Sequence, residues 1–312
     1  MDSILEYIPK GIKEEINKYN YLEEITEIRL RVNKYMILIY ETDEEITKYK
    51  VSLKDMLDIL VKISENSIYS IQNEINNGFV TINGGHRIGI CGEVILDSDN
   101  NIKNIKNINA MNIRIAKEIK GVANSLAKKI IKNGRYENTL IVSPPGCGKT
   151  TFLRDMIRLL STGIEEIELD GRNIGLIDER GEIASVYKGV PSLEVGYRTD
   201  ILSNCPKSVG IEMIIRSMGV EIIATDEIGS VEDCNAINKA VISGVKLIFT
   251  MHGEDLEDIT NHSEINKLLN KGVFKNIVVL SKENGPGKIK EIYIQKSRGV
   301  FNKINDIYQN IN

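Results

Sequence analysis

The chain has 312 residues, 42% of them hydrophobic, and its 40 basic and 44 acidic side chains leave a net charge of −4. A chain of this length and composition can form about two domains with substantial cores. The balanced charge, the 5% aromatic content and the absence of tryptophan disfavour a nucleic-acid-binding protein, which needs a basic surface or aromatic stacking platforms.

Targeting and redox signals are absent from the sequence. No apolar run approaches the roughly 20 residues of a membrane span, and the first residues lack the basic and apolar regions of a signal peptide. The four cysteines are far apart and form no C-x-x-C pair, so they indicate neither a zinc site nor a disulfide framework. We therefore expect a cytoplasmic protein with reduced thiols and no membrane span of its own.

Residues 1–115 predict a small α+β domain. The segment 100–112 repeats Asn-Ile-Lys, so its isoleucine spacing reflects compositional bias as much as structure. We place the domain junction between Ala116 and Glu137, which makes 116–136 a linker, with helical spacing at 122–131. The predicted elements of the domain are two short helices within 4–19, strands at 27–32 and 36–40, a helix at 53–63 with Ser52 as its N-cap and its continuation at 68–75, two strands within 79–94 around Gly84-Gly85, and a strand at 113–115.

Residues 139–152 carry the strongest functional signal. A short apolar run at 140–142 predicts a buried strand, two glycines allow a tight loop, and 152–160 has helical apolar spacing. A strand, a glycine loop, Lys-Thr and a helix in this order form a phosphate-binding loop, whose amides and helix N-terminus point at phosphate oxygens. The predicted nucleotide-binding residues are Ser143, Pro144, Pro145, Gly146, Cys147, Gly148, Lys149, Thr150 and Thr151.

Within this loop Lys149 would reach the β- and γ-phosphates of ATP, and the Thr150 hydroxyl would ligate Mg²⁺. Ser143 stands where the pattern G-x-x-x-x-G-K-[ST] has its first glycine. If that position needs a positive φ, serine costs about 1 kcal/mol relative to glycine. The alternative is a chance Gly-Lys-Thr in an ordinary turn, and the flanking strand and helix argue against it.

After the loop, strands and helices alternate, which predicts a parallel sheet. The predicted strands are 174–177, 221–225 and 245–250, with helices at 208–218 and 231–243. Two later strands, 277–280 and 289–294, flank the turn residues Glu283, Asn284, Gly285, Pro286 and Gly287, and we expect them to form an antiparallel hairpin that closes the sheet.

The three central strands end in acidic residues or histidine, on the side where such sheets bind ligands. Asp226 stands where a Mg²⁺-organising carboxylate belongs, and Glu227 could polarise the attacking water. The second acidic cluster, Asp178, Glu179 and Glu182, is either part of the site or a helix N-terminus that favours negative charge. His252 either senses the γ-phosphate or is a surface histidine.

Several longer stretches of the chain together form a specific pattern. They are Glu-Ile-Arg-Leu-Arg, Gly-Phe-Val-Thr-Ile-Asn-Gly-Gly-His-Arg-Ile-Gly, Asn-Ile-Arg-Ile-Ala, Ser-Pro-Pro-Gly-Cys-Gly-Lys-Thr-Thr, Ile-Asp-Glu-Arg-Gly-Glu-Ile, Tyr-Arg-Thr-Asp-Ile-Leu, Ile-Ile-Arg-Ser-Met, Ala-Thr-Asp-Glu-Ile-Gly and Thr-Met-His-Gly. With these stretches the chain resembles the stage III sporulation protein AA family over nearly its whole length. That family is similar to the hexameric ATPases of type II and type IV secretion.

The resemblance implies roles for individual positions. Asp178-Glu179 with Glu182 matches the aspartate box of the secretion ATPases, Asp226-Glu227 their Walker B motif, and His252 their histidine box. Gly84-Gly85-His86-Arg87 becomes a family feature, whereas the residues alone favour glycines that only let a sheet curve.

The resemblance also implies arginines that act between subunits. Phosphoryl transfer commonly gains from an arginine at the γ-phosphate, and the phosphate loop and Asp226-Glu227 contain none. Secretion ATPases of this type place amino-terminal arginines at a neighbour's site, so we expect Arg87 or Arg114 to act in trans. Arg198 is the alternative in the ATPase domain. Each of these three arginines could instead form a salt bridge to a surface carboxylate.

The implied fold is an α/β protein: a RecA-like P-loop ATPase domain at 137–312 behind the smaller α+β amino-terminal domain. The implied protein is a hexameric cytoplasmic motor that hydrolyses ATP with Mg²⁺. It would serve the channel between mother cell and forespore in endospore formation, and a membrane-anchored channel subunit would hold it at the membrane. Two alternatives remain open: a nucleotide-binding scaffold with negligible turnover, and a nucleic-acid translocase of the same fold.

Overall fold

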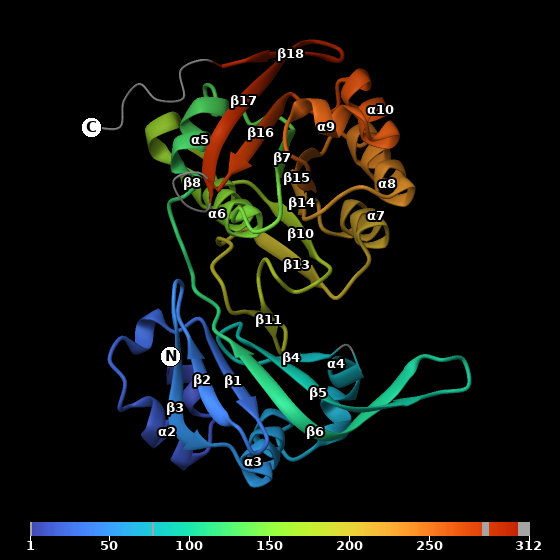
Figure 1. The fold of residues 1–312 in the computed structure, drawn as a ribbon. Coiled ribbons are helices and arrows are strands. Elements are labelled where there is room, and N and C mark those ends of the chain that lie inside the picture. Colours follow the sequence, from blue (N-terminus) through green and yellow to red (C-terminus); the bar gives the residue numbers. More distant parts are fainter. Residues whose placement is uncertain (1, 77, 283–286, 305–312) are drawn as a thin grey trace. The chain divides into compact units, whose positions relative to one another are not determined.

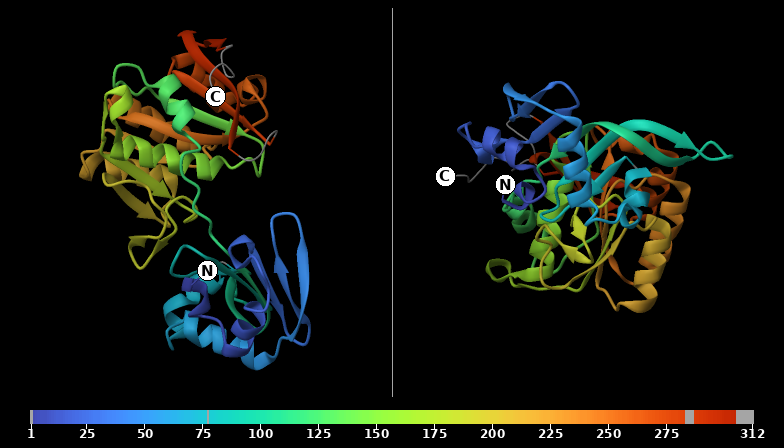
Figure 2. Two further views of the ribbon diagram at one scale, coloured as in Figure 1. Left: turned by 90° about the vertical axis from the view of Figure 1, so that its left-hand side faces the viewer. Right: turned by 90° about the horizontal axis from the view of Figure 1, so that it is seen from below.

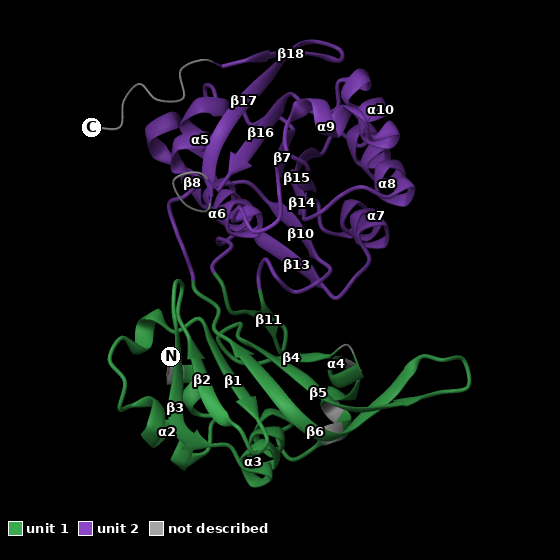
Figure 3. Cartoon of the chain, in the orientation of Figure 1, with its two compact units in different colours: residues 1–117, 185–193 green, residues 118–184, 194–312 purple. Residues whose placement is uncertain are grey.

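The computed structural model describes residues 2–76, 78–282 and 287–304 (Figure 1). Its contacts divide the chain into two compact units, the first with residues 1–117 and 185–193 and the second with 118–184 and 194–312 (Figure 3). The predicted linker at 116–136 differs from this division. The boundary lies between Lys117 and Glu118, and helix α5 (Asn124–Ile130) inside the predicted linker belongs to the second unit.

The first unit is built on a six-stranded antiparallel sheet in the order β3-β2-β1-β6-β5-β4. Its helices supply isoleucines that pack with the inward-facing strand residues into one core. The elements are α1 (Asp2–Leu5), α2 (Lys10–Ile16), the 3-10 helix η1 (Leu22–Glu24), β1 (Glu27–Arg31), β2 (Tyr35–Ile39), β3 (Glu44–Lys50), α3 (Leu53–Ile63), the 3-10 helix η2 (Ile68–Ile71), α4 (Gln72–Asn76), β4 (Phe79–Thr81), β5 (Arg87–Leu96), β6 (Ile102–Arg114), β11 (Val186–Tyr187) and β12 (Val190–Pro191).

Two strands of this sheet differ from the sequence prediction. The low-complexity stretch lies in β6, a strand of 13 residues whose Ile105, Met111 and Ile113 side chains are buried. The outer ends of β5 and β6 form a two-stranded ribbon that runs past the rest of the sheet (Figure 2). Strand β3 was not predicted, because an edge strand rich in charged residues lacks the apolar alternation of a buried one.

The hairpin β11–β12 returns to the first unit from the middle of the second, and it explains the second glycine of the Gly84-Gly85 pair. Gly84 and Gly85 have φ values of +85° and +75°, a conformation that glycine adopts without strain. A Cβ atom on Gly85 would lie 2.7 Å from the Cβ of Ser185. At the hairpin tip, Tyr187 and Lys188 both contact the carboxylate of Glu65. The glycine turn therefore gives the hairpin room to pack.

The second unit contains an eight-stranded sheet in the order β13-β10-β14-β15-β7-β16-β17-β18. Strands β13 to β16 in this order run parallel, and β17 and β18 add antiparallel edges, as predicted for the hairpin. The predicted turn residues 283–286 lie outside the described residues. Helices α5 and α6 cover one face of the sheet, and α7, α8 and α10 cover the other (Figure 1). Among described residues, no helix is both long and apolar enough to cross a membrane.

The further elements of this unit follow in chain order. They are β7 (Thr139–Ser143), α6 (Lys149–Thr162), β8 (Gly163–Ile164), the 3-10 helix η3 (Glu165–Ile167), β9 (Leu169–Asp170), β10 (Ile174–Asp178), β13 (Thr199–Ser203), α7 (Lys207–Ser217), β14 (Ile222–Thr225), α8 (Val231–Ile242), β15 (Lys246–His252), α9 (Leu256–Thr260), α10 (Ser263–Lys271), β16 (Asn276–Ser281), β17 (Lys288–Ser297) and β18 (Val300–Lys303).

Candidate nucleotide-binding site

The register of the parallel sheet brings the predicted site residues of the second unit together at the carboxyl ends of its strands. His252, the last residue of β15, lies opposite Ser143, the last residue of β7. Thr225, the last residue of β14, lies opposite Ile177 in the neighbouring β10. The phosphate loop and both acidic segments therefore begin side by side at the carboxyl ends of adjacent strands, where parallel sheets bind ligands.

The phosphate loop has the local conformation that its sequence predicts. Gly146 and Gly148 have φ values of +73° and +78°, and Gly148 is the N-cap of the 14-residue helix α6. The amides of the first turn of α6 have no partner within the helix and can donate to an anion. Ser143 is an extended, fully buried residue of β7, so the cost of a left-handed serine does not arise there.

Lys149 lies at the start of α6 and is 7% exposed. Burial lowers the pKa of its ammonium group, and the charges of Glu227 and Asp226 oppose that effect. Its Nζ atom lies 3.0 Å from Nδ1 of His252, and Nε2 of His252 lies 2.9 Å from Oε1 of Glu227. Because an ammonium group only donates hydrogen bonds, this arrangement fits the histidine tautomer that accepts at Nδ1 and donates from Nε2.

Asp226 directly follows β14 and is 3% exposed. Burial raises the pKa of its carboxyl group to about 6; Lys207 lowers it, and Asp178 and Glu227 raise it further. Within the described residues, its Oδ1 is one of two buried side-chain oxygen or nitrogen atoms without a hydrogen-bond partner. A buried carboxylate oxygen with an open position fits Mg²⁺, which prefers oxygen ligands.

The rest of a magnesium site would come from the ligand. Thr150, the other predicted metal ligand, lies in the first turn of α6. In the part of the chain that the structure describes, no three His, Cys, Asp or Glu side chains form a group that could hold a metal ion. Mg²⁺ commonly uses one or two protein oxygens, substrate phosphates and water, so the arrangement suits a metal that arrives with a nucleotide.

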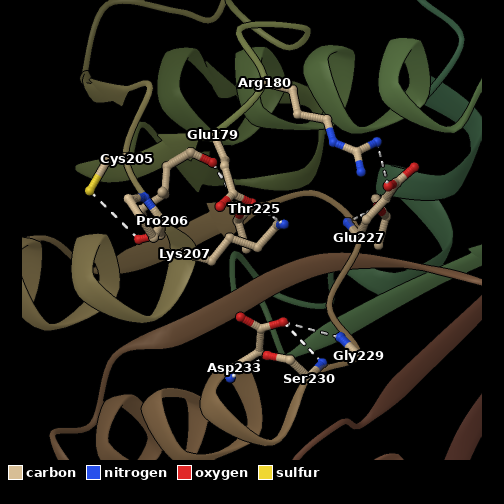
Figure 4. Close-up of polar contacts among 12 residues, drawn as sticks. Glu179, Arg180, Cys205, Pro206, Lys207, Thr225, Glu227, Gly229, Ser230 and Asp233 are labelled. Atoms are coloured by element: carbon tan, nitrogen blue, oxygen red, sulfur yellow. Dashed lines mark hydrogen bonds and ion pairs between the residues drawn. The ribbon is translucent and has the colours of Figure 1, made fainter. Parts of the chain in front are cut away.

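The backbone N–H and both carboxylate oxygens of Glu227 have polar contacts. Its backbone has a φ of +42°, and its N–H donates to Thr250 Oγ1 over 2.9 Å. One carboxylate oxygen contacts His252, and the other lies 3.0 Å from a guanidinium nitrogen of Arg180 (Figure 4). Arg180 was not predicted as a site residue, although it lies between Glu179 and Glu182 of the second acidic cluster. Its contact with Glu227 depends on the pairing of β10 with β14, which the sequence alone does not reveal.

The second acidic cluster is largely engaged in shaping its own loop. Asp178 is fully buried and accepts hydrogen bonds from the backbone N–H groups of residues 182, 183 and 184. Glu179 forms an ion pair with Lys207 of α7 (Figure 4). Arg154 of α6 donates to the carbonyl groups of residues 182 and 183. No helix begins in this loop, so the donors to Asp178 are loop amides.

The predicted trans arginines lie together in the first unit. Arg87 and Arg114 are directly opposite each other on β5 and β6. The Arg87 guanidinium lies 4.8 Å from the centre of the Phe79 ring, and Arg114 Nε donates to Glu27 over 3.2 Å. The two arginines thus form one cluster at adjacent strand positions.

Arg198, the alternative, donates to the carbonyl oxygen of Ser161 over 3.1 Å. That residue lies about 18 Å along α6 from Lys149. Arg198 is therefore at the end of the helix remote from its own phosphate loop.

A second lysine lies beside the phosphate loop and was not predicted. A Cβ atom on Gly146 would lie 3.4 Å from Nζ of Lys282, which follows β16. Gly287 N–H donates to the carbonyl oxygen of Cys147 over 2.7 Å. Lys282 follows β16 and Gly287 precedes β17, and β16 pairs with β7, so the sheet order brings these two residues to the loop.

The parallel sheet, with its phosphate loop and with carboxylates at the carboxyl ends of its strands, belongs to an α/β fold that this chain shares with two solved proteins, an ATPase and a motor. The structure of the ATPase DotB from Legionella pneumophila superimposes with a TM-score of 0.57 at 12% identity, covering 86% of this chain and 75% of that one. The pilus retraction motor PilT with bound ADP gives the same TM-score at 14% identity, covering 86% and 76%. The predicted fold class is confirmed.

The sequence comparison identifies the family. The model of "Sporulation stage III, protein AA" matches residues 2–300. Stage III sporulation protein AA of Bacillus subtilis (strain 168) is 38% identical over 296 residues, which cover 94% of this chain and 95% of that protein. The chain belongs to the stage III sporulation protein AA family, as the sequence motifs indicated.

Proposed function

We propose that this protein hydrolyses ATP and powers a secretion-like channel during endospore formation. The observation that carries the proposal is that Lys149, Asp226 and Glu227 lie close together at the carboxyl ends of adjacent strands. There the buried Oδ1 of Asp226 has no hydrogen-bond partner among the residues that the structure describes. The secretion-ATPase fold and the sporulation family support the two halves of the proposal.

In the proposed reaction the loop amides and Lys149 bind the phosphates, and Glu227 orients the attacking water in line with the γ-phosphate. Thr150 and Asp226 would hold Mg²⁺, which neutralises charge on the phosphate oxygens. His252 contacts both Lys149 and Glu227, so it can couple phosphate binding by the lysine to the position of the glutamate.

The proposal includes assembly into a hexamer in the cytoplasm, held at the membrane by a membrane-anchored channel subunit. An arginine of the Arg87–Arg114 cluster would act at a neighbour's γ-phosphate. Such an arginine is commonly worth 10³–10⁵ in rate, which corresponds to about 4–7 kcal/mol of barrier. Turnover per subunit should therefore rise with protein concentration.

Phosphate release from the purified protein, alone and after crosslinking that enforces oligomers, tests the proposal. Lys149→Ala should lose tight ATP binding or turnover. Glu227→Gln should keep ATP binding and slow hydrolysis on the order of 10²-fold or more. Normal turnover by a folded Lys149→Ala variant would refute the site. Binding without turnover in wild type would favour the scaffold, and stimulation by DNA or RNA would favour the translocase.

A further inference from the structure

Arg180 contacts the residue on which the proposed hydrolysis depends. It lies two residues after the end of β10, and Glu227 lies two residues after the end of the adjacent β14. A guanidinium nitrogen of Arg180 and Oε2 of Glu227 are 3.0 Å apart. Figure 4 shows the two side chains pointing toward each other from these neighbouring loops.

The backbone of the loop that carries Arg180 is held by hydrogen bonds to two buried side chains, Asp178 and Arg154. The carboxylate of Asp178 accepts hydrogen bonds from the amides of residues 182 to 184, and Arg154 of α6 binds the carbonyl groups of residues 182 and 183. A side chain on a loop with this much backbone support can define the position of its partner more sharply than one on an unsupported loop.

Glu227 needs such support because its backbone is in the left-handed region, with a φ of +42°. For a residue other than glycine this conformation costs about 1–2 kcal/mol, and it persists where surrounding contacts hold it. The contacts are the N–H bond to Thr250 and the side-chain contacts to His252 and Arg180. Arg180 is the cationic member of this set.

We propose that Arg180 is a positioning residue that orients the carboxylate of Glu227 from within the same subunit. This inference rests on the proposed ATPase function, but it differs from the proposed trans arginines, because Arg180 acts through Glu227 and each subunit supplies its own. Removing Arg180 should leave nucleotide binding intact and misplace Glu227 for the hydrolytic step, which can cost on the order of 10²-fold in rate.

The experiment compares Arg180→Ala and Arg180→Lys with a matched control, Arg172→Ala. Arg172 forms a comparable ion pair in the same unit, 2.9 Å from Glu221. Three quantities are measured on full-length oligomer: kcat, the Kd of a non-hydrolysable ATP analogue, and amide hydrogen exchange of residues 226–229 without nucleotide. We expect Arg180→Ala to lower kcat on the order of 10²-fold, leave Kd within about twofold and speed exchange, with part of kcat restored by Arg180→Lys.

A double variant separates positioning from direct contact with ATP. If Arg180 acts through Glu227, adding Arg180→Ala to Glu227→Gln should cause no further loss of kcat. A full additional loss, or a kcat equal to that of Arg172→Ala, overturns the inference. If wild type hydrolyses no ATP in any assembly state, the ATPase proposal fails by itself. Exchange then decides the positioning role: faster exchange in Arg180→Ala than in Arg172→Ala supports it, and equal exchange overturns it.

Discussion

Replacing Asp226 by asparagine tests whether the ionised carboxylate of this buried residue destabilises the protein when no cation is bound. Asp226 is 3% exposed, its Oδ1 has no hydrogen-bond partner within the described part of the chain, and burial raises its pKa from 3.8 to about 6. In the absence of metal, the charged carboxylate should therefore destabilise the folded state. The variant removes the charge and keeps the size of the side chain.

The sign follows from proton binding. Between pH 3.8 and about 6, the folded protein holds a proton on Asp226 that the unfolded chain has lost, so the free energy of unfolding falls as pH rises through this window. The full cost of the ionised form is about 3 kcal/mol, reached above the folded pKa. Because part of it is already present at pH 5, about 1.4 kcal/mol remains to be lost between pH 5 and pH 8.

Urea unfolding in the presence of a chelator, at pH 5 and at pH 8, measures this difference. From pH 5 to pH 8, we expect the free energy of unfolding of Asp226→Asn to rise by about 1.4 kcal/mol relative to that of wild type. Any pH-independent effect of the new amide cancels in this comparison. Asp200→Asn, which changes an exposed carboxylate of the same unit, controls for the loss of one charge. Parallel stability curves for wild type and Asp226→Asn would refute the reasoning, since the cost would then not depend on ionisation.

Three further predictions test other parts of the structure. Gly85→Ala should lower the free energy of unfolding by about 2–4 kcal/mol, because alanine would be strained at a φ of +75° and its Cβ would lie 2.7 Å from that of Ser185. Gly189→Ala, at a φ of +81° with no described atom within 4 Å of the added Cβ, should cost only about 1 kcal/mol in urea unfolding. Lys282→Ala should weaken binding of an ATP analogue several-fold in a fluorescence titration, on the order of 1 kcal/mol for one exposed cation, and unchanged affinity would remove this lysine from the site. Mixing Lys149→Ala with Arg87→Ala subunits should restore some phosphate release, because mixed interfaces pair an intact loop with an intact arginine, and absence of rescue would exclude that arginine in trans.

The second unit was largely predictable because its strands are continuous apolar runs. The phosphate loop, the three strand ends and the closing hairpin follow local patterns, namely glycine spacing and alternation of strands with helices. What the sequence could not supply is strand order. Arg180 and Lys282 reach the site only because β10 lies beside β14 and β16 beside β7, and such neighbours are fixed by packing of the whole sheet.

The first unit was harder to predict for two physical reasons. An edge strand such as β3 buries few side chains, so it carries no apolar alternation. In β6, the repeated Asn-Ile-Lys hid a strand whose burial is decided by β1 and β5 on its two sides. The return of residues 185–193 to this unit also has no local signal, because it depends on the room left by Gly85.

Most charged side chains of the site contact one another. Lys149 contacts His252, His252 contacts Glu227, and Glu227 pairs with Arg180. Among the described residues, Oδ1 of the buried Asp226 has no hydrogen-bond partner. A nucleotide that arrived without metal would have to draw Lys149 from His252 and would add negative charge near the Asp226 carboxylate. A nucleotide that arrives with Mg²⁺ supplies the cation that Asp226 lacks and the anion that Lys149 and the loop amides can bind. Metal and nucleotide should therefore bind cooperatively in this site, with the metal relieving the cost that burial imposes on Asp226.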